Sequence, residues 1–380
     1  MRLFLLNLFI IVCAIITPKG MTSLLTRNVG IVPTMHFDAI YQFGDSLSDT
    51  GNLVREQNGR TVNFARLPYG QTYFHRATGR CSDGLLMVDF FAMFFHLPLL
   101  NPFLGRGSDF TYGANFAVAG ATALDYVSLA TINISSTTTY SSLSTQLRWF
   151  KYHLATYCHN PLNCKRRLQK SLVLMGEIGG NDYNSAFAQG RTMKQVYALV
   201  PQVVQAIKNA VREVIKLGAK NIVVPGNFPI GCVPIYLVMF RANDGSKYDE
   251  LGCLKEYNEF SMFHNQHLNE AIQDLQHQSP VVAIAYADYY SAMTWLLRHA
   301  PSLGFERHRP EKACCAEGHN QYNFDLGQQA CGNPGVPVCP DPTKLVNWDG
   351  IHMTQQANKF VAIWVLRHFV PKLLQPPFRS

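Results

Sequence analysis

Charged residues are scarce in this sequence, and no part of it concentrates positive charge. Asp, Glu, Lys and Arg make up only 15% of the 380 residues, and no basic run exceeds Lys165–Arg167. Nucleic-acid binding needs clusters of basic residues to contact phosphates, so the sequence argues against it. Hydrophobic residues reach 47%, which excludes a disordered chain and predicts a folded globular protein. The net charge of +8 could favour binding to an acidic polymer or to an anionic membrane, or it could simply keep the protein soluble.

Long apolar runs are also scarce, and only one stands out. It spans Leu3–Ile16 and is too short for a comfortable membrane span. Such a run is typical of a signal peptide, which we place at residues 1–20; an N-terminal anchor helix is the alternative. Cleavage would send the mature chain into the secretory pathway, extracellular or vacuolar, with no stable membrane insertion. A sequon predicts glycosylation at Asn133, in a Ser/Thr-rich stretch that we expect to be a surface loop.

Paired C-x-x-C motifs are missing, which disfavours a zinc site. Ten cysteines are present, and Cys13 would leave with the signal peptide, so nine remain. An oxidising compartment favours disulfides, and the odd count predicts a free or intermolecular thiol. We expect bridges in three places: Cys158 with Cys164, Cys232 with Cys253, and within Cys314–Cys339. A zinc site that combines the last cluster with His319 is the alternative interpretation.

Strand-like and helix-like segments alternate along the chain, without an internal repeat or a clear linker. Five apolar segments are strand candidates: Ala39–Phe43, Asn115–Val118, Ser171–Met175, Asn221–Val224 and Val281–Ala287. The predicted helices are Asp83–His96 with Ser82 or Asp83 as its cap, Leu143–Tyr157, Met193–Leu217 ending at Gly218, Tyr248–Gln276, a segment up to His299, and Thr354–Leu373. This pattern predicts one α/β domain over residues 36–373, built on a mostly parallel, doubly wound sheet. Sites in such sheets form at the carboxyl ends of the strands.

The motif Phe43–Asn52 directly follows the first predicted strand. Its Ser46 comes after Gly44-Asp45 in a turn and could present its hydroxyl at the sheet edge. We expect the Ser46 N–H to begin the next helix, where the helix dipole would favour a developing oxyanion. A helix N-cap is the alternative role for this serine. The G-x-S-x-G elbow is absent, so the α/β-hydrolase fold is not indicated.

A second motif, Asn347–His352, lies near the end of the chain. A neutral His352 could accept the proton of the serine, and Asp349 could hold its tautomer and stabilise the imidazolium. The alternative interpretation is a surface histidine that caps the helix predicted from Thr354.

Two glycine-containing motifs follow other predicted strands. In Gly176–Asp182, the amide of Asn181 could donate to an oxyanion, and a simple tight turn is the alternative. In Asn115–Ala121, Gly120 has no side chain and could bring its N–H close to a substrate oxygen. Core packing is the alternative role for this glycine.

Together these four motifs, in this order, resemble the plant GDSL esterase/lipase family within the SGNH hydrolases. The likeness covers about residues 36–373, nearly the whole mature chain. It implies a three-layer α/β/α fold of the flavodoxin-like kind. By resemblance, Ser46 is the nucleophile, His352 is the general base and then acid, and Asp349 orients the histidine. The implied oxyanion hole consists of the Ser46 N–H, the Gly120 N–H and the Asn181 side chain.

The resemblance implies a secreted serine esterase that works through an acyl-enzyme and needs no cofactor or metal. We expect a monomer that acts on a small-molecule ester, such as an acetyl or other acyl ester of a plant specialised metabolite, for example an alkaloid. An acyltransferase with the same triad, a general lipase and a non-catalytic binding protein are the alternatives. His264 and His267 could bind a metal but lack an evident third ligand. Asp288 is either a rival triad acid or the cap of the following helix.

Overall fold

Five parallel strands form the centre of the computed structural model, which describes residues 35–56, 61–135, 138–158, 160–327 and 330–374. The predicted signal peptide lies outside these residues. The strands are β1 (Ala39–Gln42), β2 (Gly113–Asn115), β3 (Ser171–Leu174), β4 (Asn221–Pro225) and β5 (Ala283–Ala287). Their order is β2-β1-β3-β4-β5, and every pairing is parallel. This is the flavodoxin-like order, in which the winding reverses between β1 and β3.

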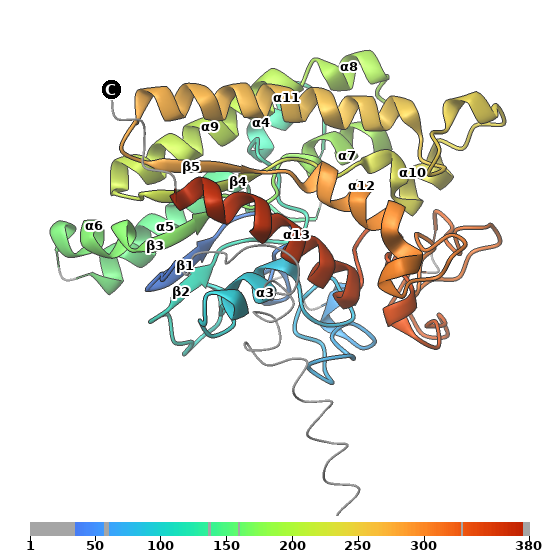
Figure 1. The fold of residues 1–380 in the computed structure, drawn as a ribbon, viewed down its shortest axis with the longest axis horizontal. Helices are drawn as coiled ribbons and strands as arrows, with labels where there is room; N and C mark the ends of the chain where they lie inside the picture. Colours follow the sequence, from blue (N-terminus) through green and yellow to red (C-terminus); the bar gives the residue numbers. More distant parts are fainter. Residues whose placement is uncertain (1–34, 57–60, 136–137, 159, 328–329, 375–380) are drawn as a thin grey trace, which may run out of the picture.

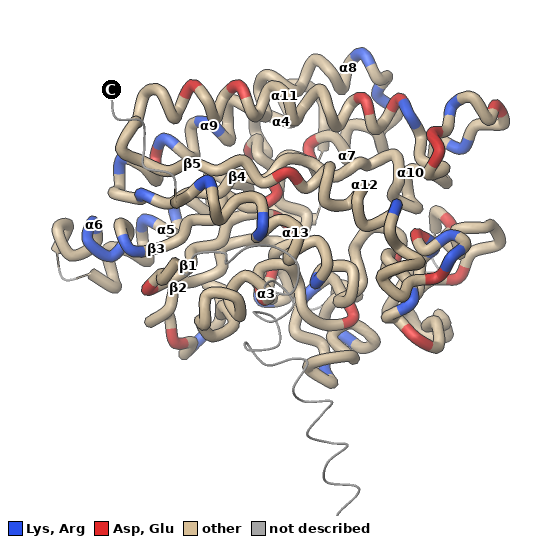
Figure 2. Tube along the Cα trace, in the orientation of Figure 1, with Lys and Arg blue, Asp and Glu red and all other residues tan. Residues whose placement is uncertain are grey.

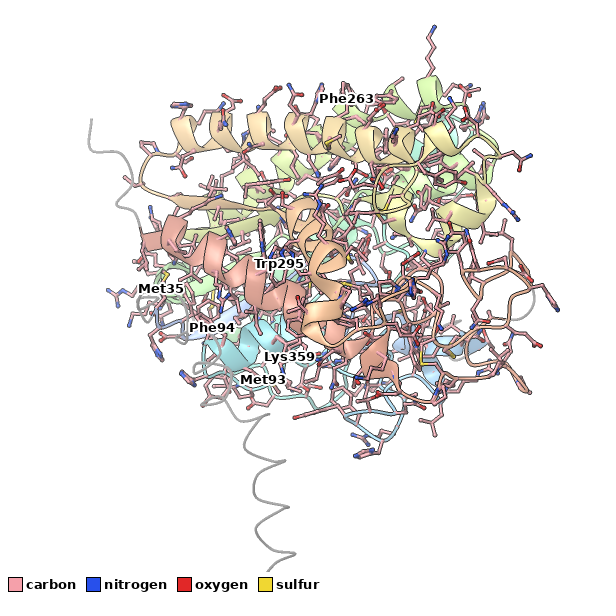
Figure 3. The ribbon with its side chains drawn as sticks, turned by 45° about the vertical axis from the view of Figure 1, so that its right-hand side comes forward. Met35, Met93, Phe94, Phe263, Trp295 and Lys359 are labelled. Atoms are coloured by element: carbon pink, nitrogen blue, oxygen red, sulfur yellow. A yellow bond between two sulfur atoms is a disulfide. The ribbon has the colours of Figure 1, made fainter. Side chains whose placement is uncertain are left out.

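Helices cover both faces of the sheet, which gives the predicted three layers (Figure 1). The first face packs against α5 (Leu143–Tyr157), α9 (Val200–Leu217) and α11 (Lys255–Gln278). The second packs against α3 (Met87–Phe94), α12 (Tyr289–His299) and α13 (Gln355–Leu374). Half-buried side chains such as Trp295 of α12 complete the second layer (Figure 3).

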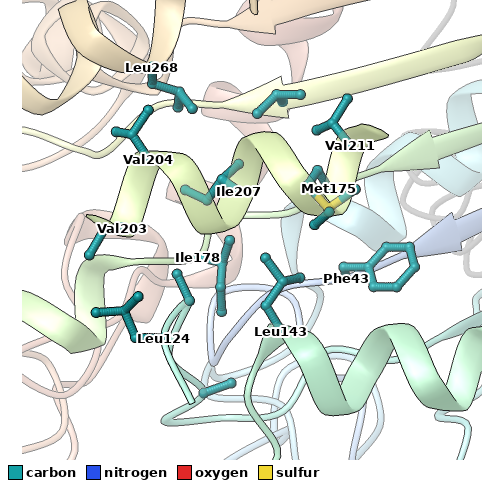
Figure 4. Close-up of a cluster of buried hydrophobic side chains, with 14 of the residues drawn as sticks. Phe43, Leu124, Leu143, Met175, Ile178, Val203, Val204, Ile207, Val211 and Leu268 are labelled. Atoms are coloured by element: carbon teal, nitrogen blue, oxygen red, sulfur yellow. The ribbon is translucent and has the colours of Figure 1, made fainter. Parts of the chain in front are cut away.

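Side chains of the strands alternate between the two faces, so the strands are apolar at nearly every position. Tyr41 of β1 points into the first cluster and Ile40 into the second. On the first face, α9 contributes an apolar stripe that includes Val203, Ile207 and Val211 at helical spacing (Figure 4). Within the described part of the chain, no helix is both long enough and apolar enough to span a membrane.

Tertiary contacts move the start of one predicted helix. The helix expected over Asp83–His96 is the shorter α3, and Ser82 does not cap it. Asp89 does, because its carboxylate accepts the backbone N–H just before the helix at 2.8 Å. The carboxylate of Asp83 instead accepts the N–H of Gln355 at 2.6 Å and so serves the start of α13.

The helix expected over Met193–Leu217 is two helices, α8 (Met193–Tyr197) and α9. Pro201 has no N–H to donate to the carbonyl of Tyr197, and its ring would clash with that carbonyl, so the first helix ends there. Gly218 ends α9 with a φ of 117°, as predicted.

Two further boundaries differ from the predictions. The helix expected from Tyr248 begins at Lys255, because the preceding residues form a turn closed by a bridge between Tyr248 and Leu254. The strand expected over Asn115–Val118 ends at Asn115, as β2. The Asn115 side chain accepts the N–H of Ala117 at 2.9 Å and turns the chain away from the sheet.

Four disulfides confirm the three predicted places: Cys158–Cys164, Cys232–Cys253, Cys314–Cys339 and Cys315–Cys331. Among the cysteines in the described ranges, the unpaired thiol is the buried Cys81. The zinc interpretation is wrong, because every cysteine of the last cluster belongs to a disulfide. His319 is exposed and lies 3.1 Å from the carboxylate of Asp325.

Candidate active site

The four motifs meet at the carboxyl ends of the strands, where β1 and β3 adjoin. Ser46 follows β1, Gly120 follows β2, and Asn181 lies in the first turn of α7 (Gly180–Ala188), after β3. Doubly wound sheets bind ligands at this edge, where the winding reverses. The expected helix at Ser46 is absent: residues 46–48 form a turn, and the next described element is the 3-10 helix η1 (Leu53–Arg55). The expected dipole of a helix that begins at Ser46 is therefore absent.

A buried amide from α5 holds the turn before Ser46. Gln146 donates to the carbonyl of Gly44 at 2.8 Å and accepts the N–H of Gly44 at 2.9 Å. Gly44 has a φ of 137°, and a Cβ there would lie 3.0 Å from the carbonyl oxygen of Glu177. Only glycine suits this position, because the conformation and the close approach both exclude a side chain.

Two polar residues of the first motif bind its loop to the neighbouring 115–121 loop. Asp49 accepts the N–H of Ala119 at 2.9 Å and three N–H groups of its own loop. Asn52 donates to two carbonyls of the neighbouring loop, both at 2.8 Å. These buried bonds fix the Ser46 loop against the loop that carries Gly120.

Ser46, His352 and Asp349 form a continuous chain of contacts, although Ser46 and His352 are 306 residues apart. His352 Nε2 lies 2.9 Å from Ser46 Oγ, and His352 Nδ1 lies 2.7 Å from Asp349 Oδ2. An ionised carboxylate only accepts, so Nδ1 carries the proton and Nε2 is free to accept from the serine. His352 is only 5% exposed, which rules out the alternative of a surface cap.

Burial and charge act in opposite directions on the two titrating groups. Burial disfavours the imidazolium of His352, but the Asp349 carboxylate outweighs it and raises the pKa of His352 above its ordinary value. Burial likewise disfavours the carboxylate of Asp349. The charge of the His352 ring and the hydrogen bonds that the carboxylate accepts nevertheless lower the pKa of Asp349. Asp349 is therefore ionised and stabilises the charged form of His352.

Tyr69 is a member of this site that the sequence did not indicate. Its hydroxyl donates to Asp349 Oδ2 at 2.8 Å, and the same oxygen faces His352 Nδ1. The Tyr69 ring is buried and meets Trp348 edge-on, with ring centroids 6.1 Å apart. No local pattern could have indicated Tyr69, because its contact with Asp349 spans 280 residues.

The loop that carries Asp349 and His352 is attached to the disulfide cluster. Cys315 donates its backbone N–H to the carbonyl of Trp348 at 2.6 Å, and Trp348 donates to the carbonyl of His352 at 2.7 Å. The bridge to Cys331 therefore supports the histidine from outside the sheet.

Two backbone donors of the site, the N–H groups of Ser46 and Gly120, have no acceptor among the described residues. Gly120 has a φ of 83°, and a Cβ there would lie 2.5 Å from Thr138 Cβ, so only glycine fits. The amide of Asn181 donates to Asp45 Oδ2 at 3.1 Å and to a backbone carbonyl at 3.0 Å. Both of its protons are engaged, so donation to an oxyanion requires one of these bonds to break.

Three buried carboxyl groups belong to the same motifs. Burial raises the pKa of Asp45 to about 7 and the pKa of Asp182 to about 7. Burial also raises the pKa of Glu177 well above its usual range, and the nearby charge of Asp45 adds to this. Asp182 accepts the N–H groups of Ala123 and Leu124 at 2.8 and 3.0 Å, which holds that loop to α7.

A cavity of about 340 Å³ opens beside Ser46 and His352. Its walls come mainly from α7, from the loop after β4 with the following α10 (Pro234–Met239), and from the loop of residues 346–353. Most of the lining side chains are apolar. This volume lies in the range of sites for small organic ligands. The arrangement thus places the Ser46 hydroxyl, in contact with His352, at one end of a largely apolar cavity.

The remaining candidates from the sequence lie outside this arrangement. His264 is buried, and its Nδ1 lies 2.7 Å from the hydroxyl of Tyr183, while His267 Nδ1 faces a backbone carbonyl at 3.0 Å. Across the described ranges, no three His, Cys, Asp or Glu side chains are grouped to hold a metal ion. Asp288 accepts a backbone N–H at 2.9 Å and caps α12, which was its alternative role.

A doubly wound sheet with a Ser–His–Asp chain at its switch point defines a serine-hydrolase type of site outside the α/β-hydrolase fold. The description "GDSL-like Lipase/Acylhydrolase" matches residues 40–365, and the chain belongs to this family. Acetylajmalan esterase 1 of Rauvolfia serpentina is 44% identical over 338 residues, which cover 89% of this chain and 88% of that protein. A GDSL esterase/lipase of Arabidopsis thaliana is 44% identical over 361 residues, which cover 94% and 88%. The predicted family and fold are confirmed, and the protein is a carboxylic ester hydrolase.

Proposed function

We propose that the protein hydrolyses esters in two acyl-transfer steps that begin at Ser46. His352 Nε2 takes the hydroxyl proton while Ser46 Oγ attacks the ester carbonyl, and the imidazolium then protonates the departing alcohol. In the second step, His352 deprotonates a water molecule that releases the acid from Ser46. Asp349 orients the ring and stabilises its charged form. The proposal depends on one observation, the chain from Ser46 to His352 to Asp349 at 2.9 and 2.7 Å.

The oxyanion formed in both steps would be stabilised by the N–H groups of Ser46 and Gly120 and by the amide of Asn181. The two backbone groups support this role, because they have no acceptor among the described residues. Asn181 would exchange its bond to Asp45 for a bond to the oxyanion. A donor of this kind contributes on the order of 10²–10³ to turnover.

As substrate we propose an acetyl or other acyl ester of a plant specialised metabolite, such as an alkaloid. Support comes from the relatives named acetylajmalan esterase and from the largely apolar cavity of about 340 Å³. We also propose that residues 1–20 are a signal peptide and that the mature monomer is extracellular or vacuolar. The disulfides support an oxidising compartment. Asn133 is exposed in a turn and is therefore accessible to glycosylation.

Covalent labelling tests the nucleophile directly. A fluorophosphonate probe should label the wild-type protein and Ser48→Ala but not Ser46→Ala, and only Ser46→Ala should lose ester hydrolysis. Ser48 is a matched control, because it lies in the same motif but outside the contact with His352. Labelling or near-normal hydrolysis in a folded Ser46→Ala protein would end the proposal. Product analysis with an added acceptor alcohol distinguishes hydrolysis from acyl transfer.

A further inference from the structure

The charged residues that line the cavity are all acidic apart from the histidine of the site. They are Asp45, Glu177 and Glu311, and no Lys or Arg is among the described residues that line it. This contrasts with the whole chain, in which 33 Lys and Arg exceed 25 Asp and Glu. Figure 2 shows that many of the basic residues lie on outer helices such as α6 (Pro161–Gln169). An anionic substrate would therefore find no Lys or Arg partner among the described residues that line the cavity.

Glu177 is the one acid of the cavity with an unsatisfied buried oxygen. The residue is 6% exposed, and its Oε2 is buried with no hydrogen-bond partner. Asp45, by comparison, accepts the N–H of Leu47 at 3.0 Å and the Asn181 amide at 3.1 Å, so each of its oxygens is occupied. Glu311 is partly exposed and pairs with a neighbouring arginine at 3.4 Å. A buried acceptor without a donor is costly, so a donor supplied to Oε2 by a ligand would be stabilising.

The backbone fixes Glu177 next to the nucleophile. Its carbonyl oxygen accepts the N–H of Asp45 at 3.0 Å, and Asp45 directly precedes Ser46 in the chain. A group that binds Glu177 therefore lies in the same cavity as the hydroxyl that attacks the ester. The other walls offer apolar contact, from Phe228 and Ile230 after β4 and from Met293 of α12.

We propose that Glu177 binds a protonated amine of the substrate, so that the enzyme selects esters whose apolar skeleton carries one cationic nitrogen. The inference rests on the proposed function and specifies its substrate. An ammonium N–H would supply the donor that Oε2 lacks, and its charge would oppose the excess of carboxylates. Burial and Asp45 raise the pKa of Glu177, and a bound ammonium would lower it again.

A matched pair of esters tests the charge preference on the wild-type enzyme. 2-(Dimethylamino)ethyl acetate is protonated at pH 7, and 3-methylbutyl acetate has the same shape without the charge. Longer spacers between nitrogen and ester extend both series. For at least one spacer, kcat/KM for the cationic ester should exceed that for its neutral isostere by about tenfold, equivalent to about 1.4 kcal/mol. An enzyme that prefers the neutral ester at every spacer length overturns the inference.

Glu177→Gln should reduce this cation-to-neutral ratio about tenfold, because the amide keeps the shape but loses the charge. Glu270→Gln is the matched control, since it removes a negative charge from the exposed side of α11, away from the cavity. It should leave the ratio within about twofold. If a folded Glu177→Gln protein loses kcat/KM equally for both esters, the ratio is unchanged, Glu177 has a structural role, and the inference is refuted.

Two readouts keep the inference separate from folding and from the proposed function. If Glu177→Gln unfolds, competitive inhibition of the wild type decides: triethylammonium should inhibit hydrolysis of the neutral ester at lower concentration than uncharged 3-ethylpentane. Equal inhibition by both refutes the inference. The proposed function is judged on the neutral ester alone, by its hydrolysis in the wild type and the loss of that hydrolysis in Ser46→Ala.

Discussion

Replacing Tyr69 by phenylalanine removes one hydroxyl from behind the catalytic chain and changes nothing else in shape. The Asp349 carboxylate accepts four hydrogen bonds: from Tyr69 at 2.8 Å, from the His352 ring at 2.7 Å, and from the N–H groups of Ile351 and His352 at 3.0 and 2.8 Å. Three of the four remain in Tyr69→Phe. A hydrogen bond to a buried charged group contributes about 1.5–3 kcal/mol, so the variant should lose stability of that size.

The loss also changes the titration of His352. Without the Tyr69 hydroxyl, the negative charge of Asp349 is less dispersed and holds the imidazolium proton more strongly, so the pKa of His352 rises further. His352 must be neutral to accept the serine proton, and activity is therefore lost as the pH falls through this pKa. The acidic limb of kcat/KM should move to higher pH by up to about one unit, which corresponds to 1.4 kcal/mol. On the plateau, looser orientation of the ring should lower kcat about three- to tenfold.

The assay is a pH profile of kcat/KM with a soluble ester, together with thermal unfolding of each protein. Tyr73→Phe serves as control, because Tyr73 makes an aromatic contact with Phe74 but is not hydrogen-bonded to Asp349. A Tyr69→Phe profile that coincides with the wild type, or moves to lower pH, would refute the positioning role of Tyr69. A loss of stability alone would make Tyr69 a packing residue.

Three more predictions concern the scaffold. Arg80→Leu leaves the buried carboxylate of Asp89 without its bidentate partner at 2.8 Å, and should cost about 3–5 kcal/mol in chemical denaturation; a loss below about 1 kcal/mol contradicts this. Replacing Cys315 and Cys331 by serine removes a disulfide between residues 16 positions apart and should lower the free energy of unfolding by about 3 kcal/mol. Esterase activity should fall further than the unfolded fraction explains. The pKa of Asp182 is about 7 in the folded protein, above its ordinary value of 3.8, so its contribution to stability is present at low pH and is lost as the pH rises from about 4 to about 7. Relative to Asp182→Asn, the free energy of unfolding of the wild type should fall by roughly 4 kcal/mol across that pH range. If the unfolding free energies of the two proteins change in parallel with pH, the raised pKa of Asp182 is contradicted.

The sequence predicted most elements because their patterns are local. Leu143–Tyr157 has the same bounds in the structure, since its apolar residues recur at helical spacing. The errors arose where a distant partner decides. Ser82 and Asp83 looked like the cap of the following helix, but the carboxylate of Asp83 is bonded to the N–H of Gln355, 272 residues away. Short-range capping rules cannot anticipate such a contact.

The site shows the same division. The motifs around Ser46, Gly120, Asn181 and His352 could be recognised from residue types and order, and the structure brings them to one edge. The residues that hold them could not be recognised: Gln146 reaches Gly44 across 102 positions of the chain. No pattern near Gln146 distinguishes it from the other polar residues of its helix, because its role exists only after the sheet has formed.

These contacts divide the site into two parts that are supported in different ways. The part with Ser46 and Gly120 is attached to the sheet through buried bonds of Asp49 and Gln146. The part with His352 is attached to the disulfide-linked loop through Cys315, in addition to the bonds from Tyr69 to Asp349 and from Ile235 to Gly350. We therefore expect a reductant or a cysteine substitution to loosen the loop of His352 before that of Ser46, while the N–H groups of Ser46 and Gly120 keep their positions. The enzyme would then lose turnover while its sheet remains intact, because proton transfer requires the 2.9 Å contact between Ser46 Oγ and His352 Nε2.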